Sequence, residues 1–235
     1  RALRRTDEAA TSKTVILPVR GEDRRYIHTF GANANFRVAD IPHDLVGAAR
    51  AFCVGGYLIL PGFDPVELAA LLSFAQSQGV CTILDVVVTE DAGPGTGTGN
   101  RDWAALTPVL PQVDFFTPND DEAQQLTGET DPVRQAQRLK EAGCGTVIVT
   151  MGEGGAVLAD GNDVICIEGF AVDVVDGSGA GDAFAAGLIA GVVQGRDTKQ
   201  ALRLASAVGA SACTRLGCTT GVFTAAEADA FLETV

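Results

Sequence analysis

The chain has few histidines and no closely paired cysteines, so it lacks the usual ligands of a zinc site. Its two histidines are His28 and His43. None of its six cysteines belongs to a C-x-x-C pair, although structural zinc sites rely on such closely spaced cysteines and histidines. Most of the cysteines lie in apolar stretches, so we expect buried free thiols in a reducing compartment such as the cytoplasm.

Long apolar runs and net positive charge are also absent. No apolar run approaches the ~20 residues that span a bilayer, and no signal-peptide core follows the basic residues 1–5. The chain has 17 basic and 30 acidic residues and a formal net charge of −13. This balance argues against partners that are nucleic acids or membranes. It still permits ATP binding, because a local group of backbone N–H donors can outweigh the overall charge.

Apolar segments with strand character alternate with helical segments over residues 52–150. This order predicts βαβ units and a parallel sheet, which makes the 235-residue chain an α/β protein. Ligands of such sheets bind at the carboxyl ends of the strands. The strands are expected at 52–60, 80–88, 113–116 and 146–150, and the helices at 40–51, 64–79, 101–110, 119–128 and 131–143.

The two ends of the chain give different patterns. Residues 13–19 and 24–30 read as the strands of a half-exposed hairpin, with turn residues at 21–23. After the last parallel strand we expect shorter strands at 156–158, 163–167 and 170–175. Helices are expected at 183–193 and 198–215, and a capping box at Thr224 and Glu227 starts the last one.

The glycine-rich stretch at 176–184 reads as a strand, a tight turn and a helix start. Small residues at a helix start expose several backbone N–H groups and can bind an anion. Asp182 would lie in the first turn beside that anion, where a carboxylate could accept a proton from an attacking hydroxyl. An alternative is purely structural: Ser178 caps the helix, the glycines allow close packing, and Asp182 interacts with the helix dipole.

Two other turns follow predicted strands and so can lie at the same edge of the sheet. Asn119 and Glu122 have the spacing of a capping arrangement at a helix start, and residues 150–155 could be a simple glycine-rich hairpin turn. Both readings stay open beside a phosphate-binding one. The Gly- and Thr-rich residues 91–100 look like a phosphate loop, but no lysine follows them, so we expect a flexible surface loop.

The pattern Asp-x-[Ser/Thr]-Gly-Ala-Gly-Asp-x-Phe at 176–184 resembles the C-terminal signature of the ribokinase-like (PfkB-type) carbohydrate kinases. The resemblance extends from about residue 13 to the C-terminus. It implies a three-layer sandwich with a mainly parallel central sheet, helices on both faces and a small β-hairpin lid. Residues 1–35 would form part of the lid and its return to the core, and residues 36–235 the nucleotide-binding and catalytic core.

The resemblance also implies an activity and its residues. The enzyme would be an ATP-dependent phosphotransferase that moves the γ-phosphate to a hydroxyl of a small sugar, with Asp182 as general base. The partners implied are ATP, Mg²⁺, the sugar, potassium and a second copy bound through the lid. The other implied positions are Gly179, Ala180 and Gly181 for the anion hole; Asn119 and Glu122 near the phosphates and Mg²⁺; Thr150, Gly152, Gly155 and Gly181 along the nucleotide; and Asp176, Ser178, Ala212, Arg215, Gly217 and Gly221 around potassium.

The chain departs from the family pattern in three places. Gly177 stands where the family usually has threonine, and residues 58–60 stand where ribokinases place a sugar-contacting acid. The family's first strand, its Gly-Gly segment with an asparagine and its early aspartate have no counterpart, so we expect an N-terminal part outside this chain. A nucleoside or sugar-phosphate kinase, or a nucleotide-binding protein without kinase activity, therefore stays open.

Overall fold

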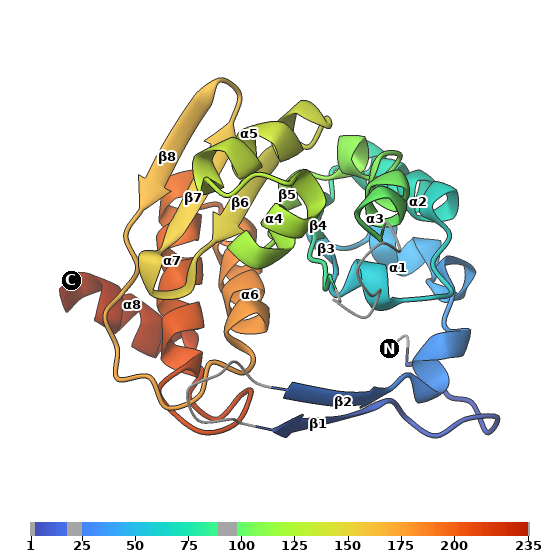
Figure 1. Ribbon diagram of the computed structural model, residues 1–235, viewed down its shortest axis with the longest axis horizontal. Coiled ribbons are helices and arrows are strands. Elements are labelled where there is room, and N and C mark those ends of the chain that lie inside the picture. Colours follow the sequence, from blue (N-terminus) through green and yellow to red (C-terminus); the bar gives the residue numbers. More distant parts are fainter. Residues whose placement is uncertain (1–2, 18–24, 89–97, 235) are drawn as a thin grey trace.

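A computed structural model describes residues 3–17, 25–88 and 98–234 and contains a six-stranded central sheet (Figure 1). The strand order is β3-β4-β5-β6-β7-β8, and the first three of the five pairings are parallel. The last two, around β7, are antiparallel. The prediction of a mainly parallel α/β sheet is therefore confirmed. The strands are β3 (Ala51–Val54), β4 (Cys81–Leu84), β5 (Phe115–Phe116), β6 (Thr146–Thr150), β7 (Ala156–Asp160) and β8 (Asp163–Ile167).

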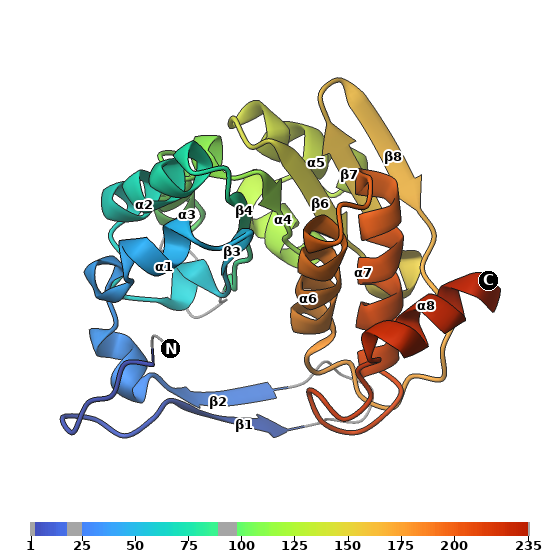
Figure 2. The ribbon, with the colours of Figure 1, turned by 180° about the vertical axis from the view of Figure 1, so that it is seen from behind.

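Helices cover both faces of this sheet (Figures 1 and 2). Alternation along β6 explains the three layers, because successive side chains of a strand point to opposite faces. Val147 and Val149 join the apolar cluster that contains residues of α2 to α5, whereas Ile148 joins the cluster of α6 and α7. The helices are α1 (His43–Gly47), α2 (Pro65–Ser77), α3 (Thr98–Leu106), α4 (Asp120–Thr127), α5 (Pro132–Glu141), α6 (Ala180–Val193), α7 (Thr198–Ala212) and α8 (Ala225–Thr234).

Helix α6 is apolar almost throughout because it lies between the sheet and α7. A Cβ atom added to Gly187 would stand 2.7 Å from the Cα atom of Ala205, and one added to Gly191 would stand 2.7 Å from the Cα atom of Ala201. The small residues of the two helices therefore bring their backbones together. This close packing lies in the second half of α6, away from the glycine-rich turn at its start.

The N-terminal hairpin is a separate two-stranded antiparallel sheet of β1 (Lys13–Leu17) and β2 (Arg25–Thr29), as predicted. Its predicted turn at 21–23 lies outside the described residues. Figure 1 shows the hairpin apart from the central sheet, below the start of α6. Ile16 of β1 nevertheless lines a hollow with Asp176 and Leu216, so the hairpin touches the loops beside that helix start.

Several predicted ends of strands and helices are wrong, because contacts with segments that are distant in the sequence decide where these elements end. The strands expected at 52–60 and 80–88 end at Val54 and Leu84, where the parallel pairing of β3 with β4 ends. The strand expected at 170–175 does not form, because that segment leaves the sheet to reach α6. The helices expected at 40–51, 101–110 and 198–215 end earlier, at Gly47, Leu106 and Ala212. The predicted loop at 91–100 lies mostly outside the described residues, and its last three residues begin α3.

The cysteines are free, as predicted, but not all are buried. Cys144 is buried and Cys53, Cys81 and Cys213 are half-buried, whereas Cys166 and Cys218 are exposed. The prediction of burial is wrong for these two because Cys166 lies on the edge strand β8 and Cys218 on a loop. Within the described ranges, every helix is too short or too polar to cross a bilayer.

Candidate active site

The turns after β5 and β6 are joined directly to one another. Asn119 and Thr150 form a parallel β-bridge, and the Thr150 N–H donates a 3.0 Å hydrogen bond to the carbonyl of Pro118. Two segments that the sequence singled out separately therefore lie side by side at the carboxyl ends of neighbouring strands. This is the edge where open α/β sheets bind ligands.

The start of α4 is a complete capping box. The Glu122 N–H donates to Oδ1 of Asn119 at 2.8 Å, and the Asn119 N–H donates to Oε2 of Glu122 at 2.9 Å. The predicted capping arrangement is confirmed. It fixes both side chains at the sheet edge without excluding a ligand, because each carboxylate or amide oxygen has a second lone pair.

The loop at 150–155 is not a plain hairpin turn. It contains a 3-10 turn at Gly152–Gly154, and the Met151 N–H donates to the carbonyl of Gly155 at 2.8 Å. Gly155 has a φ of +85°, and a Cβ atom there would lie 2.0 Å from the carbonyl oxygen of Ile167. Only glycine fits this position, so the loop is held closely against the end of β8.

The glycine-rich turn leads into α6 through a left-handed residue. Gly179 is the N-cap with a φ of +80°, and a Cβ atom there would stand 2.5 Å from the carbonyl oxygen of Cys218. The alternative in which Ser178 caps the helix is wrong: Ser178 is buried and lies one residue before the cap. Gly181 and Asp182 are exposed in the first turn of α6, and the Ala180 N–H bonds to the Gly177 carbonyl at 3.3 Å.

Asp176 ties this turn to the loop after α7. Its Oδ1 accepts from the Ser178 N–H and its Oδ2 from the Gly217 N–H, both at 3.0 Å. Of the residues expected around potassium, these three line one hollow with Ile16. Gly221 lies elsewhere in the loop, against the carbonyl of Ala212, and the side chain of Arg215 is exposed.

One carboxylate of the site, Asp85, follows β4 and was not among the residues expected from the sequence. Its Oδ2 accepts a 3.2 Å hydrogen bond from the Gly56 N–H. The pKa of Asp85 is raised to about 6, chiefly by burial; the backbone N–H groups of Gly56 and Val86 oppose the shift, and the charge of Asp182 adds to it. Asp85 was detectable as the single charged residue within the apolar segment predicted at 80–88.

Asp85 also interacts with Glu122, so it links the two predicted acidic positions. The pKa of Glu122 is raised to about 7, chiefly by burial, with the Asn119 N–H opposing the shift and the charge of Asp85 adding to it. Burial, followed by the charges of Asp85 and Asp182, raises the pKa of the Cys53 thiol to about 11. The site is therefore an acidic, partly buried group of side chains that follows the strands β4 and β5.

The carboxylate oxygens of this site are suitable ligands for a cation that keeps much of its hydration shell. In the part of the chain that the structure describes, no cluster of three or more His, Cys, Asp or Glu side chains could hold a metal ion by itself. Mg²⁺ commonly binds through one or two carboxylates, waters and substrate phosphates. Asp85 and Glu122 offer such a carboxylate set.

Comparison with known proteins gives a consistent picture. The family model described as pfkB family carbohydrate kinase matches residues 1–225. An ATP-dependent 6-phosphofructokinase of Thermoanaerobacterium thermosaccharolyticum is 35% identical over 135 residues, which are 55% of this chain and 41% of that protein. A ribokinase of Haemophilus influenzae is 25% identical over 228 residues, which are 95% of this chain and 69% of that protein.

The structural match supports the same fold. An Escherichia coli protein described as a ribokinase II, solved in complex with ATP and Mg²⁺, superimposes with a TM-score of 0.77 at 23% identity. The match covers 97% of this chain and 72% of the other. The chain thus spans about two fifths of the first of these two curated relatives and about two thirds of the second.

Proposed function

Since this chain belongs to the pfkB family of carbohydrate kinases, we propose that its protein is an ATP-dependent kinase that transfers the γ-phosphate to a hydroxyl of a small sugar. The observation that carries the proposal is the helix start at Ala180, where the exposed Asp182 follows a glycine turn and lies close enough to Asp85 for its charge to raise the pKa of that residue. Such a helix start can bind phosphate and supply a base within reach of it.

Asp182 is assigned as the general base that takes the proton of the attacking hydroxyl. The N–H groups of Gly179, Ala180 and Gly181 are assigned to the charge that develops on the transferring phosphoryl group. Preorganised donors suit this reaction because phosphoryl transfer requires mainly positioning and charge stabilisation. The close contact of Gly179 with the backbone of Cys218 keeps these donors in place.

Asn119 and Glu122 are assigned to the Mg²⁺-bound phosphates, and Thr150, Gly152 and Gly155 to the nucleotide. Mg²⁺ bound there would neutralise phosphate charge. The β-bridge between Asn119 and Thr150 supports one continuous nucleotide site. A potassium ion beside Asp176 and Ser178, with the carbonyls of Ala212, Arg215 and Gly217 and with Gly221 nearby, remains part of the proposal.

The hairpin β1–β2 is assigned as a lid and as a contact between two copies. Its Val15 and Ile27 are paired across the strands and are 53% and 63% exposed. Exposed apolar side chains on a small sheet suit a protein interface. We place the enzyme in the cytoplasm, where free thiols are kept reduced. The residue range 1–35 for the lid and 36–235 for the core is proposed on the same basis.

A coupled ADP-release assay over a panel of ribose, ketoses, nucleosides and sugar phosphates tests the function with the complete protein. Turnover with a nucleoside or a sugar phosphate alone would select the alternative acceptor class. Tight ATP binding without turnover on any acceptor would instead favour a nucleotide-binding protein without kinase activity.

The role of Asp182 is tested by Asp182→Asn, with Glu141→Gln as the control that removes an exposed carboxylate at the far end of the sheet. Asp182→Asn should lower kcat by roughly 10²–10⁴-fold and leave ATP binding intact, whereas the control should keep both. Unchanged turnover in Asp182→Asn would exclude Asp182 as the base.

A further inference from the structure

Strand β8 is an edge of the central sheet, and in the described ranges it pairs with β7 alone. Residues 161–162 form the two-residue turn between β7 and β8, and Asp160 and Asp163 are paired on either side of it. In such a turn the N–H of the fourth residue, here Asp163, donates a hydrogen bond to the carbonyl of the first, here Asp160. Hydrogen-bonding directions alternate along an antiparallel ladder. Val164 and Cys166 therefore direct their backbone groups outward, away from β7.

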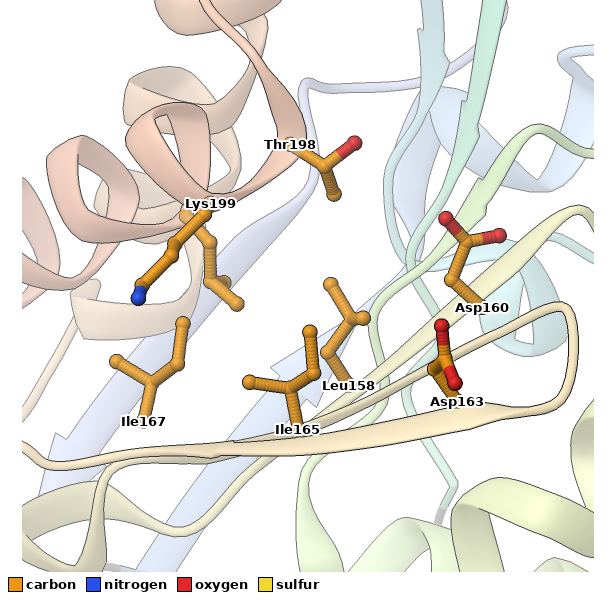
Figure 3. A pocket seen from close by; sticks show the side chains of 8 residues that line it. Leu158, Asp160, Asp163, Ile165, Ile167, Thr198 and Lys199 are labelled. Atoms are coloured by element: carbon orange, nitrogen blue, oxygen red, sulfur yellow. The ribbon is translucent and has the colours of Figure 1, made fainter.

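The same edge carries a hollow with apolar walls and charged ends. Leu158, Ile165, Ile167 and Leu202 line it between β8 and the start of α7, and Ile165 is 41% exposed. Figure 3 shows Lys199 beside Ile167 at one end of the hollow and the carboxylates of Asp160 and Asp163 at the other.

We propose that β8 is the contact strand of a symmetric dimer, in which a second copy of this chain adds its own β8 antiparallel to the first. A two-fold axis at Ile165 sets the register. Val164 then lies opposite the partner's Cys166, and these residues exchange the outward backbone hydrogen bonds. The pairing is isologous, as a closed two-fold interface requires, and it would extend the sheet across both copies.

The distribution of charge along the hollow favours a second copy of this chain as the partner, and it favours an antiparallel over a parallel pairing of the two β8 strands. An antiparallel pairing about Ile165 places Asp163 opposite the partner's Ile167, at the end of the hollow where the partner's Lys199 lies. Each copy thus offers both halves of the same ion pair, and the two Ile165 side chains meet at the centre. A parallel pairing would instead bring like charges together, which is destabilising.

The interface is distinct from the hairpin β1–β2, and it does not depend on kinase activity. A strand of five residues buries little area, so the dimer belongs with small, weak interfaces. The overall charge of −13 adds repulsion between copies, which opposes the attraction of the ion pairs and keeps the association weak.

A disulfide trap tests the register directly. Opposed residues of a non-hydrogen-bonded pair have Cα atoms about 4.5 Å apart, which lies within the range that a disulfide bridges. In a Cys166→Ser, Cys218→Ser background, Ile165→Cys should form a covalent dimer in a glutathione redox buffer. Val174→Cys, which is more exposed at 67%, serves as the control. Equal cross-linking of the two variants, or none by Ile165→Cys, would overturn the proposal.

Sedimentation velocity of the native protein gives the second readout. Lys199→Glu should weaken the dimer about tenfold, and adding Asp160→Lys and Asp163→Lys to it should restore the dimer, because the charges are then exchanged. A protein that stays monomeric at every concentration contradicts the proposal. The same holds if association in an Ile27→Lys background, which removes the contact proposed for the hairpin, does not respond to Lys199→Glu or to the variant with exchanged charges.

Discussion

Gly181→Ala is the most informative single change, because it separates stability from phosphate binding. Gly181 is the second residue of α6, its φ is not positive, and an added Cβ atom would meet no atom within 4 Å. Alanine is favoured over glycine in a helix by about 0.5–1 kcal/mol. For a domain of this size, 1 kcal/mol corresponds to a Tm change of about 2–4 °C, so the melting temperature should rise by about 1–4 °C.

The same methyl group should damage turnover. It would stand on the exposed side of the helix start, where the proposed phosphate approaches the backbone N–H groups. Loss of one preorganised donor to a transition state typically costs about 10²–10³-fold in rate. We therefore expect kcat/KM for ATP to fall about 100-fold or more in a coupled ADP-release assay.

Gly187→Ala is the matched control on the same helix. Its Cβ atom would stand 2.7 Å from the Cα atom of Ala205 and 3.1 Å from the carbonyl oxygen of Leu204. Overpacking of this kind costs about 1–3 kcal/mol, so this variant should melt earlier and yet retain turnover at a temperature where it is folded. A Gly181→Ala enzyme with raised Tm and full activity would refute the anion-hole assignment, because the phosphate then does not approach this backbone.

Two further predictions concern the acidic residues of the candidate site and the helix cap beside them. The raised pKa values of Asp85, about 6, and Glu122, about 7, mean that the folded state binds more protons than the unfolded state above about pH 4. The free energy of unfolding in urea, measured without Mg²⁺, should therefore fall as pH rises from about 4 to 7. Asp85→Asn combined with Glu122→Gln should flatten this slope, and an unchanged slope would count against the assignment. Asn119→Ser should keep the helix cap, whereas Asn119→Ala should cost about 1 kcal/mol; if the serine variant also keeps full kcat and KM for ATP, Asn119 acts only as a cap.

The local signals in the sequence were sufficient where neighbouring residues make the interaction. The capping boxes of Asn119 with Glu122 and of Thr224 with Glu227 both form, because each joins residues three positions apart. Strand β6 has the predicted bounds, because its continuous apolar run is buried on both faces of the sheet. The alternation of strands and helices likewise predicted the parallel part of the sheet.

Other features were decided by distant partners. Strands β3 and β4 end at Val54 and Leu84, where the backbone pairing between them ends. The residues at 170–175 remain outside the sheet although they are mostly apolar. The N-cap of α6 is Gly179 rather than Ser178, because the backbone of Cys218 lies against the turn. None of these partners is near in sequence.

By itself, then, the sequence determined the α/β class, the family signature at 176–184 and the helix starts, because these depend on periodicity and on contacts between near neighbours. Only the tertiary structure brought Asp85 together with Asp182 and Glu122, raised two of their pKa values by burial, and left β8 as an edge. Burial and charge proximity depend on which segments pack together, and residue spacing along the chain does not contain that information.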